Sequence, residues 1–406
     1  MGGPVLHYSY LTDSARGRLF ARLPRRLGPS SSPQALAVGL GATLYTPGIR
    51  PDLAETVLKR GRSGCASMVL CLEDAVADAD VGLAEDNVVA AVKDLARRDA
   101  SALEALPLLF IRPRTPEQLL DVGRRLGAAA GLLTGFVLPK FENASGRAER
   151  FLDALDLLNR EVGACARTPD GAPPARPALL AMPIIEHPVT THRETRAGAL
   201  LGVRDLLRAR QELILSVRLG TTDMSAAYGL RRTRDLTIYD VAVVAEVIAD
   251  VVGLLGRADE GWVISGPVWE HYSGTERILR PQLRSTPFDA ANSAALRDRL
   301  LGANLDGLIR EIELDLANGL VGKTVIHPSH VPVVHALHVV GHEEYLDALD
   351  IVAAEGGGAV ASRSGARMNE AKPHRAWAQR TLARADAFGV ARPDVTFADL
   401  LEASMK

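Results

Sequence analysis

Eight short apolar segments recur along the chain, and amphipathic stretches separate most of them. The segments span residues 41–48, 67–76, 106–114, 135–142, 178–188, 213–223, 262–270 and 322–328. Apolar runs of this length, bounded by Gly and Pro, are typical of strands buried on both faces. The stretches with helical period span 50–61, 86–99, 115–127, 146–163, 237–256 and 308–319. This alternation predicts an α/β protein built as a (β/α)8 TIM barrel, with a doubly wound open sheet as the competing architecture.

Three regions lie outside this repeat. Residues 1–41 are rich in Arg, contain Asp13 as their single acid and form a predicted N-terminal extension. A transit peptide has such a composition, but the stretch lacks an amphipathic period, so we expect a cytoplasmic protein. Residues 42–330 form the predicted barrel domain. Residues 331–406 form a predicted C-terminal helical extension that serves as a lid or an oligomerisation arm, and 166–178 reads as a Pro/Gly-rich surface loop.

Composition excludes two classes of partner. The 406 residues include 47 basic and 49 acidic side chains, for a net charge of −2. This balance gives no electrostatic basis for binding nucleic acid. No apolar run is long enough to span a membrane. We therefore expect a protein that binds a small-molecule ligand and neither nucleic acid nor membrane.

Polar side chains gather at the carboxyl ends of the predicted strands, where a barrel keeps its active site. Barrel closure brings all eight strand ends around one pocket, so their charges must face each other. The candidates are Arg50, Glu73, Asp74, Arg112, Arg114, Lys140, Glu186, Asp223 and His327.

Glu186 and Asp223 end two consecutive apolar runs, so we expect them to be neighbours in space. Neither strand tip carries a positive residue, and adjacent carboxylates repel or share a proton. A divalent cation resolves this repulsion, and oxygen ligands with open positions suit Mg²⁺, with Mn²⁺ as a second fit. The alternative is a salt-bridged pair that uses Arg112 or Lys140.

Arg112 enters the same predicted mouth from the segment "LLFIRPR". Its guanidinium matches a substrate carboxylate in two-point geometry, with Glu73 or Asp74 holding it in place. Structural pairing of those two acids with Arg112 is an equal alternative.

The chain has only six lysines among its 47 basic residues, so a Lys at a structured position suggests that a compact ammonium is needed. Lys140 and Lys323 are two such positions. The string "ANGLVGKT" at 317–324 fits a relaxed phosphate-loop pattern. However, a phosphate loop follows a strand and opens a helix, whereas here a helix precedes and a strand follows. A nucleotide-binding protein is therefore a remote alternative.

Seven motifs follow one another between about residues 43 and 388: "LYTPGIRP", "VLCLEDAV", "IRPR", "VLPKFE", "PIIEHP", "RLGTTDMSAAYG" and "GLVGKTVIHPSHVPVVH". In this order they resemble the citrate lyase β-subunit/HpcH-HpaI aldolase superfamily. The chain is longer than typical members and is similar to the branch of carbon–carbon bond lyases found with bacterial stress-response gene clusters. It also has His187 where many members carry a small residue.

The resemblance implies a Mg²⁺-dependent lyase or aldolase that acts on a 3-hydroxyacyl thioester or a hydroxy-oxo acid. It also implies a homo-oligomer, trimeric or larger, assembled through the terminal helices. It implies Glu186 and Asp223 as metal ligands, with the metal chelating a 2-oxo or 2-hydroxy acid unit, and Arg112 as the substrate arginine. Glu73, Asp74, Lys140 and His327 are the further candidates for substrate binding. The general base stays open between His327, His187 and an acid of a neighbouring subunit, and the acyl carrier between coenzyme A and a carrier protein. A catalytically silent scaffold subunit of the same fold is the non-enzyme alternative.

Overall fold

The computed structural model describes residues 5–28, 31–163, 178–272, 305–354, 357–363, 365 and 367–405. All eight predicted strands are present within these ranges, each shorter than its apolar segment. They are β2 (Ala42–Pro47), β3 (Ser67–Cys71), β4 (Leu108–Arg112), β5 (Leu133–Leu138), β6 (Leu180–Ile185), β7 (Val217–Leu219), β8 (Ile264–Ser265) and β9 (Lys323–Val325). The predicted loop at 166–178 lies almost wholly outside the described residues.

The eight strands run parallel in the order β8-β7-β6-β5-β4-β3-β2-β9, so chain neighbours are sheet neighbours except at the closure. A bridge between Gly266 and Lys323 joins the two ends. There Gly266 N–H donates to Gly322 O at 3.0 Å, and Thr324 N–H donates to Gly266 O at 2.9 Å. The sheet is therefore a nearly closed barrel, which confirms the TIM-barrel prediction and excludes the open sheet.

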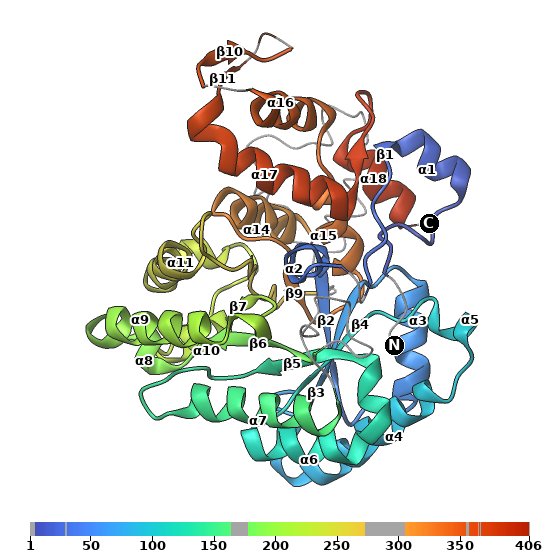
Figure 1. Cartoon of the computed structure of the whole chain (residues 1–406), viewed down its shortest axis with the longest axis vertical. Helices are drawn as coiled ribbons and strands as arrows, with labels where there is room; N and C mark the ends of the chain where they lie inside the picture. The colour runs from blue at the N-terminus through green and yellow to red at the C-terminus, as the bar shows by residue number, and fades with distance from the viewer. Residues whose placement is uncertain are drawn as a thin grey trace.

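Helices surround the barrel (Figure 1). They are α3 (Leu53–Arg62), α4 (Val81–Ala96), α6 (Pro116–Leu126), α7 (Arg147–Glu161), α9 (Arg193–Ala209), α11 (Ala242–Leu255), α14 (Asp306–Ala317) and α15 (His330–His338). Thr115 caps α6 by accepting from Gln118 N–H, with Pro116 at the first position, as its pattern predicts. Gly319 follows the end of α14 with φ of +83°, which suits its predicted role at the helix end. The helix α9 has no counterpart in the predicted set.

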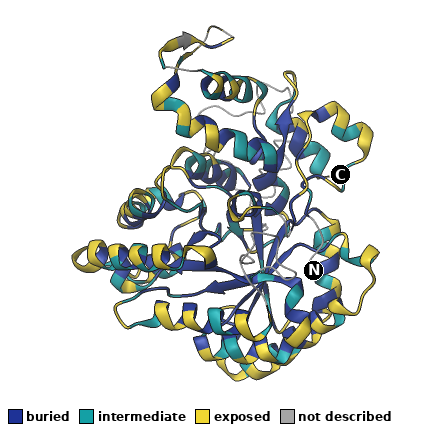
Figure 2. Cartoon of the chain, in the orientation of Figure 1, coloured by how far each residue is buried: buried dark blue, intermediate teal, exposed yellow. Residues whose placement is uncertain are grey.

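Side chains of the strands alternate between the barrel interior and the helical layer. Val217 and Leu219 of β7, for example, belong to the cluster packed against the outer helices, and Arg218 between them points inward. Figure 2 shows buried strands at the centre and helices whose outer faces are exposed. The two faces of the sheet are thus both covered, as apolar strands require.

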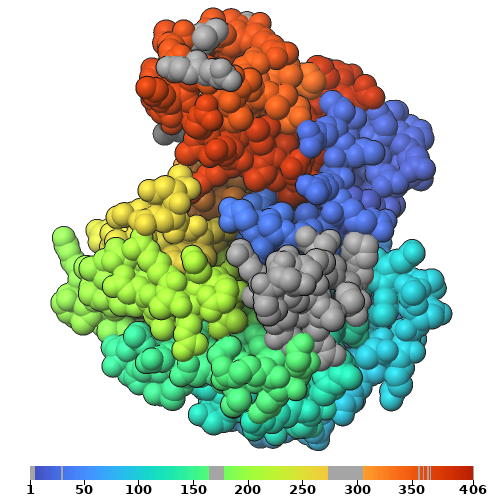
Figure 3. Space-filling view, viewed as in Figure 1, coloured from blue at the N-terminus to red at the C-terminus, as the bar shows by residue number. Residues whose placement is uncertain are grey.

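The two ends of the chain pack together beside the barrel. The N-terminal segment forms α1 (Asp13–Leu19), β1 (Phe20–Arg22) and α2 (Pro33–Gly39). The C-terminal segment forms α16 (His342–Ala353), β10 (Ala359–Ala361), β11 (Met368–Glu370), α17 (Ala371–Phe388), β12 (Val390–Ala391) and α18 (Phe397–Ser404). The strands β1 and β12 pair antiparallel, and Figures 1 and 3 show the two segments side by side. The helical prediction for the tail is confirmed, and its three short strands were not predicted.

No helix in the described part of the chain has the length and apolar content needed to cross a bilayer.

Candidate functional site

Five consecutive barrel strands deliver six charged side chains to one end of the barrel. We call this group the strand-end cluster: Glu73 and Asp74 after β3, Arg112 at the end of β4, Lys140 after β5, Glu186 after β6 and Asp223 after β7. The sequence pattern placed Asp223 at the end of the strand. In the structure it lies instead in the short helix α10 (Thr221–Ala226), directly after β7. Six of the predicted site residues are therefore brought together.

Arg112 is buried against the acids that follow β3. Its Nη1 lies 3.0 Å from Glu73 Oε2 and its Nη2 lies 3.4 Å from Asp74 Oδ2. Its Nε donates to Cys71 Sγ at 3.3 Å, and its guanidinium stacks 5.3 Å from the ring centroid of Tyr45. Both acids therefore hold the guanidinium in one orientation at the barrel mouth.

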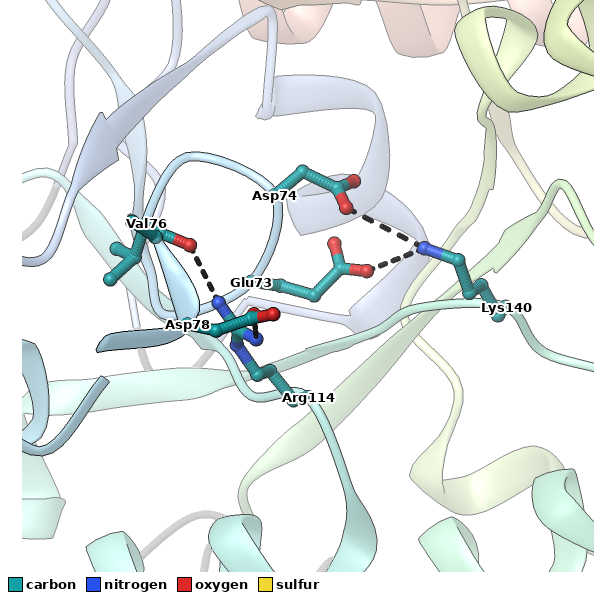
Figure 4. Close-up of a pocket in the computed structure, with 7 residues that line it drawn as sticks. Glu73, Asp74, Val76, Asp78, Arg114 and Lys140 are labelled. Atoms are coloured by element: carbon teal, nitrogen blue, oxygen red, sulfur yellow. Dashed lines mark hydrogen bonds and ion pairs between the residues drawn. The ribbon is translucent and has the colours of Figure 1, made fainter. Parts of the chain in front are cut away.

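Lys140 connects the acids on both sides of the mouth, and Figure 4 shows its contacts with Glu73 and Asp74. Its Nζ lies 2.6 Å from Glu73 Oε1, 3.6 Å from Asp74 Oδ1 and 3.5 Å from Asp223 Oδ1. Its backbone N–H donates to Glu186 Oε1 at 2.8 Å. As predicted, the tips of β6 and β7 carry no Lys or Arg. The neighbouring tip of β5 carries Lys140, however, and its ammonium pairs with Asp223. The alternative of a salt-bridged pair that uses Lys140 is therefore present.

Glu186 is buried and sits against Gly220. A Cβ on Gly220 would lie 1.9 Å from Glu186 Oε2, so the glycine leaves the space that this carboxylate fills. Burial, together with repulsion from Asp223, raises the pKa of Glu186 to about 8. Without a further positive charge, this carboxyl group therefore holds its proton at neutral pH.

The two acids after β3 have opposite pKa shifts. Burial opposes ionisation of Glu73, but Arg112 and Lys140 outweigh it and lower the pKa of Glu73 to about 2. Burial and the neighbouring Glu73 raise the pKa of Asp74 to about 6. The coupling between the two acids therefore favours the ionised form of Glu73 and the protonated form of Asp74.

A divalent cation fits the donor set of this cluster. Fully ionised, the cluster holds four carboxylates and two cations, a formal excess of two negative charges. The described residues contain no group of three or more His, Cys, Asp and Glu side chains arranged for a metal. Two carboxylates with open positions nevertheless match Mg²⁺, which keeps several waters and accepts substrate oxygens. Glu186 and Asp223 would hold such an ion.

A pocket of about 560 Å³ opens beside the cluster. Its lining consists of Glu73, Asp74, Val76, Ala77, Asp78, Arg114 and Lys140, and Figure 4 shows the charged members around it. Arg114, which follows β4, is bound to the loop after β3, because its Nε donates to Leu72 O at 2.8 Å and its Nη2 to Val76 O at 2.6 Å. Glu73, Asp74 and Lys140 therefore belong both to the pocket and to the strand-end cluster.

The predicted histidines have other contacts. His327 Nδ1 lies 2.7 Å from Ser329 Oγ, and its ring stacks on Tyr272 at 5.1 Å. His187 caps the short helix α8 (Pro188–Thr191), where its Nδ1 accepts from Val189 N–H at 3.2 Å. Among the described contacts, neither ring reaches the strand-end cluster.

Lys323 lies away from the strand-end cluster, in a buried ionic network. Its Nζ is 2.9 Å from Glu311 Oε1 and 2.7 Å from Asp315 Oδ2, and all three side chains are at most 2% exposed. The helix α14 precedes it and the strand β9 carries it, as the sequence order indicated. A lysine enclosed between two carboxylates cannot reach a phosphate, so the remote nucleotide-binding alternative is wrong.

Sequence reasoning missed Arg218, which lies inside the barrel. It is 1% exposed, and it donates to Thr43 Oγ1 at 3.2 Å and to Thr324 Oγ1 at 2.6 Å. Its guanidinium lies 5.7 Å from the Tyr45 ring that also faces Arg112. A charged residue within the apolar run "LILSVRLG" was the available signal, since such a run has little tolerance for a charge.

The family model described as a C–C bond lyase of the TIM-barrel fold matches residues 34–390. No curated protein matches the chain significantly.

Three solved structures illustrate the likeness. A citrate lyase from Burkholderia xenovorans is 16% identical, with 89% of this chain and 96% of that chain covered and a TM-score of 0.55. A malate synthase from Haloferax volcanii, in a magnesium/glyoxylate complex, is 14% identical, with 72% and 73% covered and a TM-score of 0.50. The protein CitE from Mycobacterium tuberculosis, in complex with magnesium, acetoacetate and coenzyme A, is 19% identical, with 86% and 99% covered and a TM-score of 0.49.

Proposed function

Because the chain belongs to the family of C–C bond lyases with the TIM-barrel fold, we propose that it cleaves or forms a carbon–carbon bond next to a hydroxyl group, with Mg²⁺ as its metal. The substrate class is a 3-hydroxyacyl thioester or a hydroxy-oxo acid. The observation that carries this proposal is the meeting of Glu186, Asp223 and Arg112 at the carboxyl ends of β4, β6 and β7. A structural relative, the Haloferax volcanii malate synthase, is a magnesium/glyoxylate complex, and glyoxylate is a 2-oxo acid.

Each residue of the strand-end cluster has a role in this scheme. Glu186 and Asp223 would hold the metal, which would supply Lewis-acid polarisation of substrate oxygens when bound. Arg112 binds a substrate carboxylate or oxyanion, because its guanidinium presents several donors in a fixed fork. Glu73 and Asp74 keep that fork oriented, and Lys140 contacts the substrate from the adjoining pocket.

In the cleavage direction, the substrate hydroxyl gives its proton to the general base, and its carbon becomes a carbonyl as the adjacent carbon–carbon bond breaks. The electron pair of that bond moves into the carbonyl group of the other fragment, which leaves as an enolate. Arg112 and Lys140 stabilise the negative charge that develops on oxygen, since both are positioned before the reaction begins. For His327 or His187 to act as the general base, its ring would have to leave its present partner, Ser329 or Val189, and turn toward the strand-end cluster. We also propose that the protein is a homo-oligomer, trimeric or larger.

The test is an assay of the purified protein with Mg²⁺ on a panel of 3-hydroxyacyl thioesters and 4-hydroxy-2-oxo acids. We expect turnover of at least one panel member, and we expect Asp223→Asn to abolish turnover and Mg²⁺ binding while the fold stays intact. The matched control is Asp259→Asn, at an exposed position, which should behave like the wild type. Binding of Mg²⁺ and a keto acid without turnover of any panel member would instead favour the scaffold alternative.

A further inference from the structure

Lys140 contacts both carboxylates of the proposed metal site, through different parts of the residue. Its backbone N–H binds Glu186 at 2.8 Å, and its ammonium lies 3.5 Å from Asp223. The ammonium is also 2.6 Å from Glu73 and 3.6 Å from Asp74. A single residue thus joins the two acids of the metal site to the two acids of the adjoining pocket.

The backbone at Lys140 makes this double contact possible. Its φ of +51° is in the left-handed region, which residues with side chains seldom adopt. The turn is held on the far side by Phe141 N–H, which donates to Ile184 O at 3.0 Å. The N–H and the side chain of one residue can therefore both reach the acids at the mouth of the barrel.

We propose that the Lys140 ammonium is an internal cation that a divalent metal displaces from Asp223. The inference rests on the proposed function, because it takes Glu186 and Asp223 as the metal ligands. Two cations cannot share one carboxylate without repulsion, and the ammonium has stronger partners at hand in Glu73 and Asp74. Metal binding then breaks the longer contact, at 3.5 Å, and leaves the shorter one, at 2.6 Å.

The test measures Mg²⁺ affinity by isothermal titration calorimetry on the full-length protein, without substrate. We expect Lys140→Met to bind Mg²⁺ roughly tenfold more tightly than the wild type, because a competing positive charge is gone and the backbone N–H to Glu186 remains. Lys140→Arg keeps the charge and should stay close to the wild-type affinity. The matched control is Lys93→Met, at an exposed position of α4, which should leave the affinity unchanged.

Equal or weaker Mg²⁺ binding by Lys140→Met would overturn the inference. A crystal structure of the wild type with Mg²⁺ provides a second measurement, in which Nζ should leave Asp223 and stay beside Glu73. Retention of the Asp223 contact in the presence of bound metal would also overturn it. If the wild type and Asp223→Asn bind Mg²⁺ equally, or neither binds it, the proposed function fails instead.

Discussion

Gly220→Ala is the substitution that most directly tests the placement of Glu186. The added Cβ would lie 1.9 Å from Glu186 Oε2 and 2.5 Å from Glu186 Cβ, whereas real Cβ atoms essentially never approach closer than 3.0 Å. Backbone strain is not the cause, because Gly220 has φ of −100°, which alanine adopts readily. The carboxylate must therefore move by roughly 1 Å. Rotation of the Glu186 carboxylate alone does not relieve the contact, because the added Cβ also crowds the Cβ of Glu186.

A shift of this size has a predictable cost. A misplacement of about 1 Å in a catalytic group costs on the order of 100-fold in rate. We expect kcat/KM to fall by roughly that factor and Mg²⁺ affinity to fall at least about tenfold, equal to about 1.4 kcal/mol of binding free energy. The crowding itself should lower the free energy of unfolding by about 1–3 kcal/mol.

The assay compares Gly220→Ala with Gly198→Ala by calorimetric Mg²⁺ titration, steady-state kinetics and urea denaturation. Gly198 lies on α9, and its added Cβ would meet no atom within 4 Å. Because a glycine inside a helix is less favourable than alanine, Gly198→Ala should raise the free energy of unfolding by about 0.5–1 kcal/mol, without a change in Mg²⁺ affinity. Wild-type Mg²⁺ affinity and rate in Gly220→Ala would refute the assignment of Glu186 to the metal site.

Three further predictions concern the rest of the structure. Lys323→Met leaves the buried Asp315 without its cation and leaves Glu311 with Arg232 alone. It should cost about 3–5 kcal/mol of unfolding free energy, measured by urea denaturation, with Mg²⁺ affinity retained. Burial lowers the pKa of His7 to about 4 and of His338 to about 3. Below about pH 6.5, these histidines are therefore protonated in the unfolded chain but neutral in the folded protein. Stability should fall as the pH drops from about 6.5 to 4, by about 1.4 kcal/mol per pH unit for each histidine. His7→Gln should flatten the measured slope by that amount, and an unchanged slope would contradict the explanation. Arg112→Lys should lower kcat/KM by roughly 100-fold with unchanged Mg²⁺ affinity in calorimetry, and an equal loss of affinity would show that Arg112 acts through the metal site.

Local patterns predicted the elements of the barrel because they depend on local causes. Apolar runs bounded by Gly and Pro mark the strands, and a Thr-Pro start and a Gly end mark α6 and α14. The same patterns overestimated strand length. The run 213–223 contains only three residues of β7, because pairing partners, not side-chain character, determine where a strand ends. The helix α9 was missed, and the small sheet β1–β12 joins residues some 370 positions apart, which no local pattern encodes.

Sequence alone also determined which charged residues stand at the strand ends, since each follows an apolar run by one to four residues. Tertiary structure decided which of them meet. It directs Lys140 to Asp223 and Glu186, and turns His327 and His187 toward other partners. It encloses Lys323 between Glu311 and Asp315. The physical reason is that a strand's position follows from its own apolar residues, whereas the partner of a charge depends on backbone turns and on neighbouring strands distant in the chain.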